Sequence, residues 1–320
     1  MPRDPRWVAE GGCLDEVTSV AIQNRFLLRP SDELNDAVLG VIGYAQRQVG
    51  MRICGVTVLS SHYHMLLWPE DADQRARFMC LVNTNLSKEV GRLHDWPGTM
   101  FPDRYHSVPV SDEEAAQVAR LKYLLANGTK EFLVDRPEEW PGVHSVEALR
   151  DGKPLVGHWV DRTKEFAALQ LRGERPEPET YTTEERVILS PLPCWAHVPQ
   201  DEARRRVRDM VEEIAEEAAR ERVREDRRSL GAARILRAKP HHRPKEVDLS
   251  PKPRFHAATA AAFKVMREAY GEVIAAFRAA SARLLEGDRD AVFPEGTFPP
   301  GLPFVPFPLT ALARARGQPA

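Results

Sequence analysis

Residues 53–68 read ICGVTVLSSHYHMLLW, two apolar runs separated by the polar pair Ser60-Ser61. The first run, Ile53 to Leu59, is β-branched and apolar, and the second, His62 to Trp68, is stopped by Pro69. Short apolar runs with a tight polar break between them are typical of adjacent strands joined as a hairpin. The stretch therefore predicts a β-hairpin that carries histidines at the start of its second strand.

His62 and His64 are two residues apart in that strand, so their imidazoles are expected to project from the same face of the sheet. Tyr63, Met65 and Leu67 would point to the opposite face. Two imidazoles side by side suit one divalent cation. The alternative is a hydrogen-bonded histidine pair at a strand end, and the three-residue pattern alone leaves both interpretations open.

The sequence on either side of the hairpin predicts alternating strands and helices. We expect a strand over 17–28, helices over 30–49 and 73–93, an edge strand over 100–110 and a helix over 111–127. The last helix starts with Ser111-Asp112-Glu113-Glu114, a capping-box pattern, and Gly128 is a typical C-terminal stop.

Tyr123 and Asn127 are four residues apart on this last helix, so they are expected to lie on one face, turned away from the apolar stripe around Leu121. A tyrosine and an amide presented together can supply a nucleophile and an oxygen ligand. The alternative is a half-buried tyrosine beside a helix-terminal asparagine.

The second half of the chain has a different composition. Residues 135–200 are rich in Pro, Gly and charge, which is typical of connecting structure. A long charged helix is expected from Asp201 and a second helix over 255–285, followed by a Pro-rich tail. We expect a catalytic domain over 1–150, a connecting region over 151–200 and a mainly helical region over 201–320.

The whole-chain composition is that of a soluble globular protein, with 320 residues, 42% hydrophobic and 29% charged. No stretch approaches the roughly 20 apolar residues of a membrane helix. The first thirty residues lack the apolar core of a secretory signal. The four cysteines are scattered, which argues against a disulfide framework or a cysteine-rich zinc site. We expect a cytoplasmic protein with no membrane contact.

Charge is unevenly distributed along the chain, although the net charge is only −2. Residues 1–150 hold 16 basic and 21 acidic residues, whereas 220–245 hold 10 basic and 3 acidic residues. A basic cluster of this kind is one footprint of phosphate binding, and a solvated helix face is the alternative. The candidate nucleic-acid contacts are Arg104, Arg220, Arg224, Arg227 and Arg228.

The combination of a His-hydrophobic-His strand with Tyr-x-x-x-Asn on a helix about sixty residues later resembles the HUH single-tyrosine transposases. The similarity is greatest to the branch associated with REP palindromes. The segments SSHYHMLLWPED, FPDRYHSVPV and NGTKEFLVDRPEEWPGVHS resemble the family at the histidines, at an Arg-Tyr strand and after the asparagine. The resemblance covers about residues 15–150, and Gly128 stands where the family usually has proline.

The resemblance implies both a fold and a reaction. The fold would be α+β, a ferredoxin-like antiparallel sheet with helices on one side, and the C-terminal region would be a helical extension. His62, His64 and Asn127 would hold Mg²⁺ or Mn²⁺, and Tyr123 would attack a phosphorus of single-stranded or hairpin DNA. The protein would be a monomer or a homodimer.

Three alternatives remain at this point. Tyr105 is a rival nucleophile, and His106 is a further candidate metal ligand. A domesticated DNA- or RNA-binding protein that keeps the fold without cleaving is the alternative function.

Overall fold

The computed structural model describes residues 5–9, 11–172, 177–244 and 253–300. Within these residues the strands are β1 (Asp15–Val20), β2 (Arg52–Val58), β3 (His62–Trp68), β4 (His106–Pro109), β5 (Leu155–Val160) and β6 (Thr182–Val187). The helices are α1 (Asp32–Val49), α2 (Ala72–His94), α3 (Glu114–Lys130), α4 (Val146–Asp151), α5 (Arg162–Arg172), α6 (Gln200–Arg224), α7 (Ala232–Arg237) and α8 (Ala260–Leu285).

The first half of the chain forms a four-stranded sheet in the order β2-β3-β1-β4. Each neighbouring pair is antiparallel. Together with the chain order β1-α1-β2-β3-α2-β4, this strand order is the ferredoxin-like split βαβ arrangement. The predicted hairpin is formed by β2 and β3, and the α+β fold class is confirmed.

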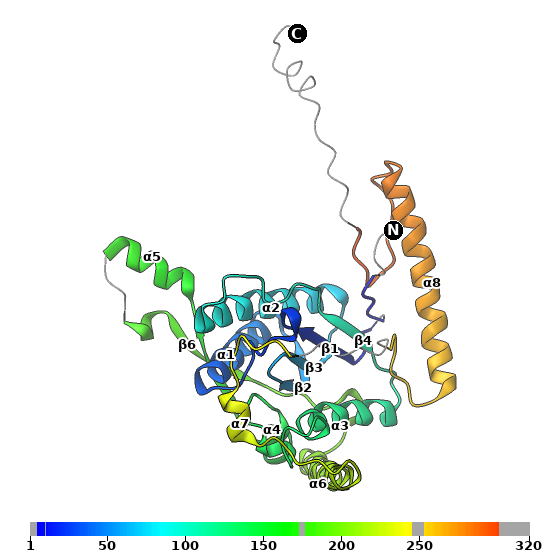
Figure 1. Cartoon of the computed structure of the whole chain (residues 1–320). Coiled ribbons are helices and arrows are strands. Elements are labelled where there is room, and N and C mark those ends of the chain that lie inside the picture. The colour runs from blue at the N-terminus through cyan, green and yellow to red at the C-terminus, as the bar shows by residue number, and fades with distance from the viewer. Residues whose placement is uncertain (1–4, 10, 173–176, 245–252, 301–320) are drawn as a thin grey trace.

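Helices α1 and α2 cover one face of this sheet (Figure 1). The buried core on that face includes Val17, Tyr63, Met65 and Leu67 from the strands. These side chains point away from His62 and His64, as the two-residue alternation predicts. The histidine face is therefore the opposite one.

The opposite face is covered by α3, with α6 packed behind it (Figure 1). Leu66 of β3 packs in the same cluster as Leu121, Leu124 and Leu125 of α3. Gly55 permits this close contact, because a Cβ there would lie 3.3 Å from the Leu124 side chain. The expectation of helices on one side holds for α1 and α2, whereas α3 brings Tyr123 and Asn127 to the histidine face.

Helix α3 begins and ends differently from the capping-box prediction. Its N-cap residue is Glu113, and the Ser111 hydroxyl donates to the Glu113 carboxylate at 2.8 Å instead of capping the helix. Glu114 accepts hydrogen bonds from Trp195 Nε1 and Arg206 of α6, so it is unavailable for a reciprocal cap. A neighbouring residue engages the Ser111 side chain and tertiary partners engage Glu114. The helix continues through Gly128 to Lys130.

Residues 151–200, expected to be connecting structure, contain a second sheet formed by β5 and β6. These two strands, with α5 between them in the chain, pack directly on α1. The close approach depends on Gly40 of α1 and Gly157 of β5, because a Cβ on either residue would overlap the backbone of the other element. The strands gave no strong pattern in the sequence, because β5 is interrupted by Gly157 and the middle of β6 is charged.

The remaining predictions differ mainly at element ends. The first strand ends at Val20, and Gln23 and Asn24 turn the chain with positive φ values of 55° and 54°. β4 is an edge strand as predicted, but it is only four residues long. Among the described residues no helix is long and apolar enough to cross a bilayer. The Pro-rich tail from residue 301 onward lies outside the described residues.

Candidate functional site

The site is built on β1 and β3 and is covered by α3. The antiparallel register places His64 opposite Thr18 of β1 and Thr57 of β2, so all three side chains share a row across the sheet. The turn before β3 contributes Ser61, next to His62. Two central strands and one helix therefore fix the functional side chains.

The two histidines lie side by side, as the spacing predicts. Their ring centroids are 5.0 Å apart, with the rings nearly perpendicular at 79°. His62 Nδ1 lies 3.0 Å from the Ser61 hydroxyl. His64 Nδ1 lies 3.0 Å from the Thr18 hydroxyl and 3.4 Å from a carboxylate oxygen of Glu16. A carboxylate beside Nδ1 favours the tautomer with a proton there, so the lone pair of a neutral His64 ring is at Nε2.

Glu16 is the centre of a buried charged cluster on this face. Its Oε1 contacts His64, while its Oε2 lies 3.3 Å from Arg120 of α3 and 3.0 Å from His256 Nε2. Burial alone would raise the pKa of Glu16, but hydrogen bonds from His256 and His64 and their charges lower it well below its ordinary value. Glu16 is therefore an ionised carboxylate tying together β3, α3 and the C-terminal region.

Tyr123 lies against this cluster. Its ring meets the His64 ring edge-on, with centroids 6.0 Å apart and an angle of 81°. Arg120 and Lys130, one turn before it and two turns after it, each place a cationic group 4.6 Å from the ring centroid. The side chain is half-buried. Burial and the Glu16 charge raise the pKa of Tyr123, and Arg120 opposes this.

Asn127 lies one turn after Tyr123 and is buried, with 4% exposure. Its Nδ2 donates to the backbone carbonyls of Tyr123 and Leu124, both at 3.2 Å. With the amide nitrogen engaged by the helix, the amide oxygen is the atom of Asn127 that can serve as a ligand.

The donor set fits a hard or borderline divalent cation. Among the described residues, no group of three or more His, Cys, Asp or Glu side chains is arranged to hold a metal. The metal site that the sequence resemblance implies would consist of the two imidazoles and the amide oxygen of Asn127. The hydrogen bonds at the Nδ1 atoms of both histidines are of the kind that orients metal-binding imidazoles.

The rival candidates lie at the edge of the sheet. Tyr105 precedes β4, and the Arg6 guanidinium lies 3.8 Å from its ring centroid. His106 is opposite Thr18, so β1 separates it from the histidine pair. Arg104 is exposed in the loop before β4. The structure thus groups His62 and His64 with Tyr123 and leaves Tyr105 apart from them.

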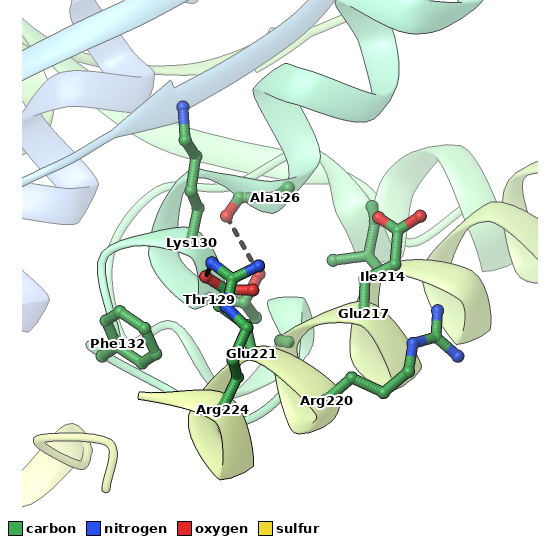
Figure 2. Close-up of a pocket in the computed structure, with 10 residues that line it drawn as sticks. Ala126, Thr129, Lys130, Phe132, Ile214, Glu217, Arg220, Glu221 and Arg224 are labelled. Carbon is green, nitrogen blue, oxygen red and sulfur yellow. Dashed lines mark hydrogen bonds and ion pairs between the residues drawn. The ribbon is translucent and has the colours of Figure 1, made fainter. Parts of the chain in front are cut away.

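The arginines of the basic segment lie at and after the end of α6. Arg220 and Arg224 line a cavity of about 660 Å³ between α6 and the C-terminal end of α3. Figure 2 shows the Lys130 ammonium pointing out of this cavity, away from both arginines. Arg220 lies 3.7 Å from Glu216, and Arg224 pairs with Glu221.

The two arginines that follow α6 extend this basic segment. The Arg227 guanidinium lies 4.2 Å from the Phe132 ring centroid. Arg228 is exposed. The two arginines within α6 therefore lie beside acidic side chains. Arg227, the first arginine after the helix, lies beside an aromatic ring.

Four residues of the site were not among the sequence predictions: Glu16, Thr18, Arg120 and His256. Glu16 and Thr18 alternate on β1, so the pattern was visible, but only the pairing of β1 with β3 shows that they share the histidine face. His256 reaches the site from a segment more than a hundred residues after α3, where it pairs with the end of β4. No local sequence signal reports such a contact.

No protein-family model matches the chain, and no curated protein sequence matches it. Two solved structures are similar to parts of it. One, a REP-associated tyrosine transposase bound to a REP hairpin, is 17% identical, with a TM-score of 0.36, and the match covers 55% of this chain and 89% of that chain. The other, assigned as a transposase of Deinococcus radiodurans, is 15% identical, with a TM-score of 0.27, and the match covers 39% of this chain and 98% of that chain.

Proposed function

We propose that this protein cleaves and rejoins single-stranded DNA through a covalent phosphotyrosine, the reaction class of the HUH transposases that its sequence motifs resemble. The observation that carries the proposal is the contact between Tyr123 and His64, with His62 beside them on the same face. A tyrosine nucleophile and two cation ligands are thus brought together from segments about sixty residues apart.

In this reaction the Tyr123 oxygen attacks the phosphorus of the scissile phosphodiester and its phenolic proton passes to solvent. The bond from phosphorus to the 3′-oxygen breaks, and that oxygen leaves as a 3′-hydroxyl after taking up a proton. The downstream strand, which keeps the phosphorus on its 5′-oxygen, stays attached to Tyr123 as a 5′-phosphotyrosine. Because the phosphodiester energy is conserved in the new bond, a 3′-hydroxyl from another strand can reverse the step and join DNA.

The chain's own residues prepare this attack. Arg120 places positive charge beside the Tyr123 ring, which favours the phenolate. The same charge is near the position where the phosphate would bind and would offset charge that develops there. His62, His64 and Asn127 would hold Mg²⁺ or Mn²⁺, and a bound divalent cation would polarise a phosphate oxygen.

The half-burial of Tyr123 favours a single strand as substrate. A phosphate must approach the tyrosine where α3 lies against the sheet, with Arg120 and Lys130 on either side. Duplex DNA is stiff over many base pairs, whereas an unpaired tract bends easily into such a site. A hairpin with an unpaired flank would meet this requirement.

A covalent-adduct assay tests the proposal. The protein is incubated with labelled hairpin and single-stranded DNA from the flanks of its own gene, with Mg²⁺ or Mn²⁺. We expect a labelled band that survives denaturation, requires the cation and disappears in Tyr123→Phe and in His62→Ala. Tyr44→Phe, at a tyrosine of α1 stacked on Trp159, is the matched control and should leave the band unchanged.

Two outcomes would contradict the proposal. A band that persists in Tyr123→Phe and is lost in Tyr105→Phe would move the nucleophile to the edge of the sheet. The absence of a band under all conditions, with tight retention of the same DNA, would favour the non-cleaving binding protein.

A further inference from the structure

A second cavity lies at the outer edge of the sheet, beside β4, and has no part in the site described above. Its volume is about 210 Å³. Its walls come from the N-terminal segment around Trp7, from β4 and from the C-terminal segment 253–255, which are far apart in the sequence. The C-terminal segment lies outside the part of the chain that resembles the transposases.

The chemistry of the lining is specific. Aromatic rings and guanidinium groups line the cavity together: Trp7, Tyr105, Phe255, Tyr270, Arg6 and Arg254. Among the described residues that line it, none is acidic. In contrast, Glu217 and Glu221 line the cavity between α3 and α6 and offset its arginines. Aromatic side chains interleaved with arginines are the features with which proteins bind unpaired nucleotides.

Three of the aromatic residues, Trp7, Tyr270 and Phe255, form one connected cluster. The Tyr270 ring lies 6.1 Å from the Trp7 ring and 5.3 Å from the Phe255 ring, centroid to centroid. Arg6 lies 3.8 Å from the Tyr105 ring centroid, a cation–π contact. Burial lowers the pKa of Arg6. Such a partly desolvated guanidinium would gain from an added phosphate.

A buried network holds the N-terminal wall in place. Arg75 of α2 is 1% exposed, and its guanidinium donates to the backbone carbonyls of Arg6 at 2.9 Å and Trp7 at 3.3 Å. The same guanidinium pairs with the buried Asp15, which also accepts a hydrogen bond from Ser107 of β4 at 2.9 Å. The N-terminal wall is therefore fixed to the sheet.

The cavity is close to the proposed active site. His106, which lines it, is opposite Thr18, and Thr18 is opposite His64. Strands are about 4.8 Å apart, so two strand spacings, roughly 10 Å, separate the cavity wall from the histidine pair. A DNA strand with its phosphate at Tyr123 could reach the cavity within a few nucleotides.

We infer that this cavity binds one unpaired nucleotide of the DNA substrate, with the base stacked on the aromatic cluster and its phosphate held by Arg6 and Arg254. The assignment rests on the proposed function for the DNA strand itself. It adds a second contact that holds the strand beside the active site and involves the C-terminal region directly.

Binding without cleavage tests the assignment. Tyr123→Phe protein, in buffer without divalent cations, is titrated against two fluorescent 20-mers, oligo(dT) and an abasic strand with the same phosphates. We expect the aromatic cluster to bind oligo(dT) about tenfold more tightly than the abasic strand. The double variant Tyr123→Phe/Trp7→Ala should lose most of this preference for oligo(dT) over the abasic strand. The double variant Tyr123→Phe/Trp159→Ala, changed on β5, is the control and should keep the preference.

Two further measurements guard against misfolding of the Trp7 variant. Arg254 is exposed, so Arg254→Ala should fold normally and weaken binding of both strands by a similar factor. Photocrosslinking of a 5-iodouracil strand to the Tyr123→Phe protein should modify peptides that contain Trp7, Tyr105, Phe255 or Tyr270.

The outcomes separate the two proposals. If wild-type protein forms the covalent adduct but base preference survives Trp7→Ala and crosslinks map elsewhere, the cavity assignment is wrong and the proposed function stands. If the protein binds neither strand and forms no adduct, both are wrong.

Discussion

The buried carboxylate of Glu16 is negatively charged, and its two oxygens contact different elements. One oxygen orients His64 of β3, and the other holds Arg120 of α3 and His256. Removing the charge would leave Arg120 and the histidines without a common partner in a site with little access to water. Such buried charged networks are strongly coupled, so a conservative change is expected to act on several groups at once.

The first prediction concerns Glu16→Gln. The amide keeps the size of the side chain but no longer favours the proton at His64 Nδ1, so cation binding should weaken by roughly 10- to 100-fold, as for other residues that orient metal ligands. The measurement is the Mn²⁺ concentration that gives half-maximal adduct formation.

Glu113→Gln is the matched control for Glu16→Gln. Glu113 precedes α3, and its carboxylate accepts hydrogen bonds from Ser111, Ala258 and Thr259. An equal Mn²⁺ requirement in the wild type and Glu16→Gln would show that Glu16 does not orient His64.

The second prediction concerns Arg120. Arg120→Gln removes the cation that favours the Tyr123 phenolate and leaves Glu16 with less compensation, so adduct formation at saturating DNA and Mn²⁺ should slow by about tenfold or more. Arg120→Lys keeps the charge and should recover part of the rate. If Arg120→Lys is as slow as Arg120→Gln, the role of Arg120 depends on its guanidinium geometry and not on charge.

At the scale of elements, His144 links the sheet to the start of α4. It pairs with Thr57 of β2, and its Nδ1 accepts a hydrogen bond from the Val146 backbone at 3.1 Å. Burial lowers the pKa of His144 to about 4 from its ordinary value of 6.5, against opposing effects of the Leu125 backbone, Glu138 and Glu147. The folded protein therefore requires this ring to be neutral.

The third prediction is a loss of stability in mild acid. Between pH 6.5 and about 4 the unfolded chain binds a proton at His144 that the folded chain does not, so the free energy of unfolding falls as the pH drops through this window, by up to about 3 kcal/mol. Urea unfolding at pH 7 and pH 5 measures the change.

His144→Asn keeps an acceptor for the Val146 N–H but cannot take up the proton, so its stability should vary less between pH 7 and pH 5. The exposed His197→Asn is the control and should behave like the wild type. The Glu16 carboxyl, whose pKa is lowered from 4.5, adds its own loss of stability only below that value. An unchanged pH dependence in His144→Asn would rule out this histidine as the cause.

The elements that sequence patterns predicted well are those with a clear local signal. The hairpin of β2 and β3 and helices α1 and α2 follow from hydrophobic period and turn residues, within one or two residues of the observed ends. The start of α6 is within one residue of the expected position. β5 and β6 were missed because Gly157 interrupts β5 and consecutive charged residues, Glu184 to Arg186, fill the middle of β6. Both strands are held by packing on α1, with Gly40 and Gly157 at the contact. Tertiary packing, not local preference, defines these strands.

The same distinction applies to the candidate site. The sequence predicted that His62 and His64 share a face, because a strand fixes the direction of alternate side chains. It could not place Glu16 or His256 beside them, because those contacts depend on strand register and on a segment that returns from the C-terminal region. Spacing within one element is readable from sequence, whereas spacing between elements requires the fold.

At the scale of the whole molecule, the C-terminal region is attached to the four-stranded sheet and to α3 at several points. His256 pairs with Val110 beyond β4 and reaches Glu16. Glu113, just before α3, accepts hydrogen bonds from the backbone of Ala258 and from the Thr259 hydroxyl, at the start of α8. Figure 1 shows α8 beside the β4 edge of the sheet, on the opposite side of the molecule from α5. The C-terminal region therefore packs against the four-stranded sheet and contributes His256 to the candidate site.

The distribution of charge over the molecule limits how DNA can be attracted. Residues 1–150 are net acidic, so nonspecific attraction must come from local groups. The arginines of α6 are such groups, but Arg220 is close to Glu216 and Arg224 pairs with Glu221. Exposed pairs of this kind are worth at most about 1 kcal/mol, so a phosphate can displace the carboxylate.

The fourth prediction separates a DNA arm from a solvated helix. For single strands, each phosphate contact contributes about −0.7 to the slope of log K against log salt concentration. If Arg220 and Arg224 contact the DNA, Arg220→Ala with Arg224→Ala should make the slope shallower by about 1.4 and weaken binding at low salt. Arg205→Ala, on the same helix and paired with Glu202, is the control that should change neither. A slope unchanged by the double substitution would mean that these arginines only solvate α6, and the cation contacts to DNA would then have to come from Arg120, Lys130 and the edge of the sheet.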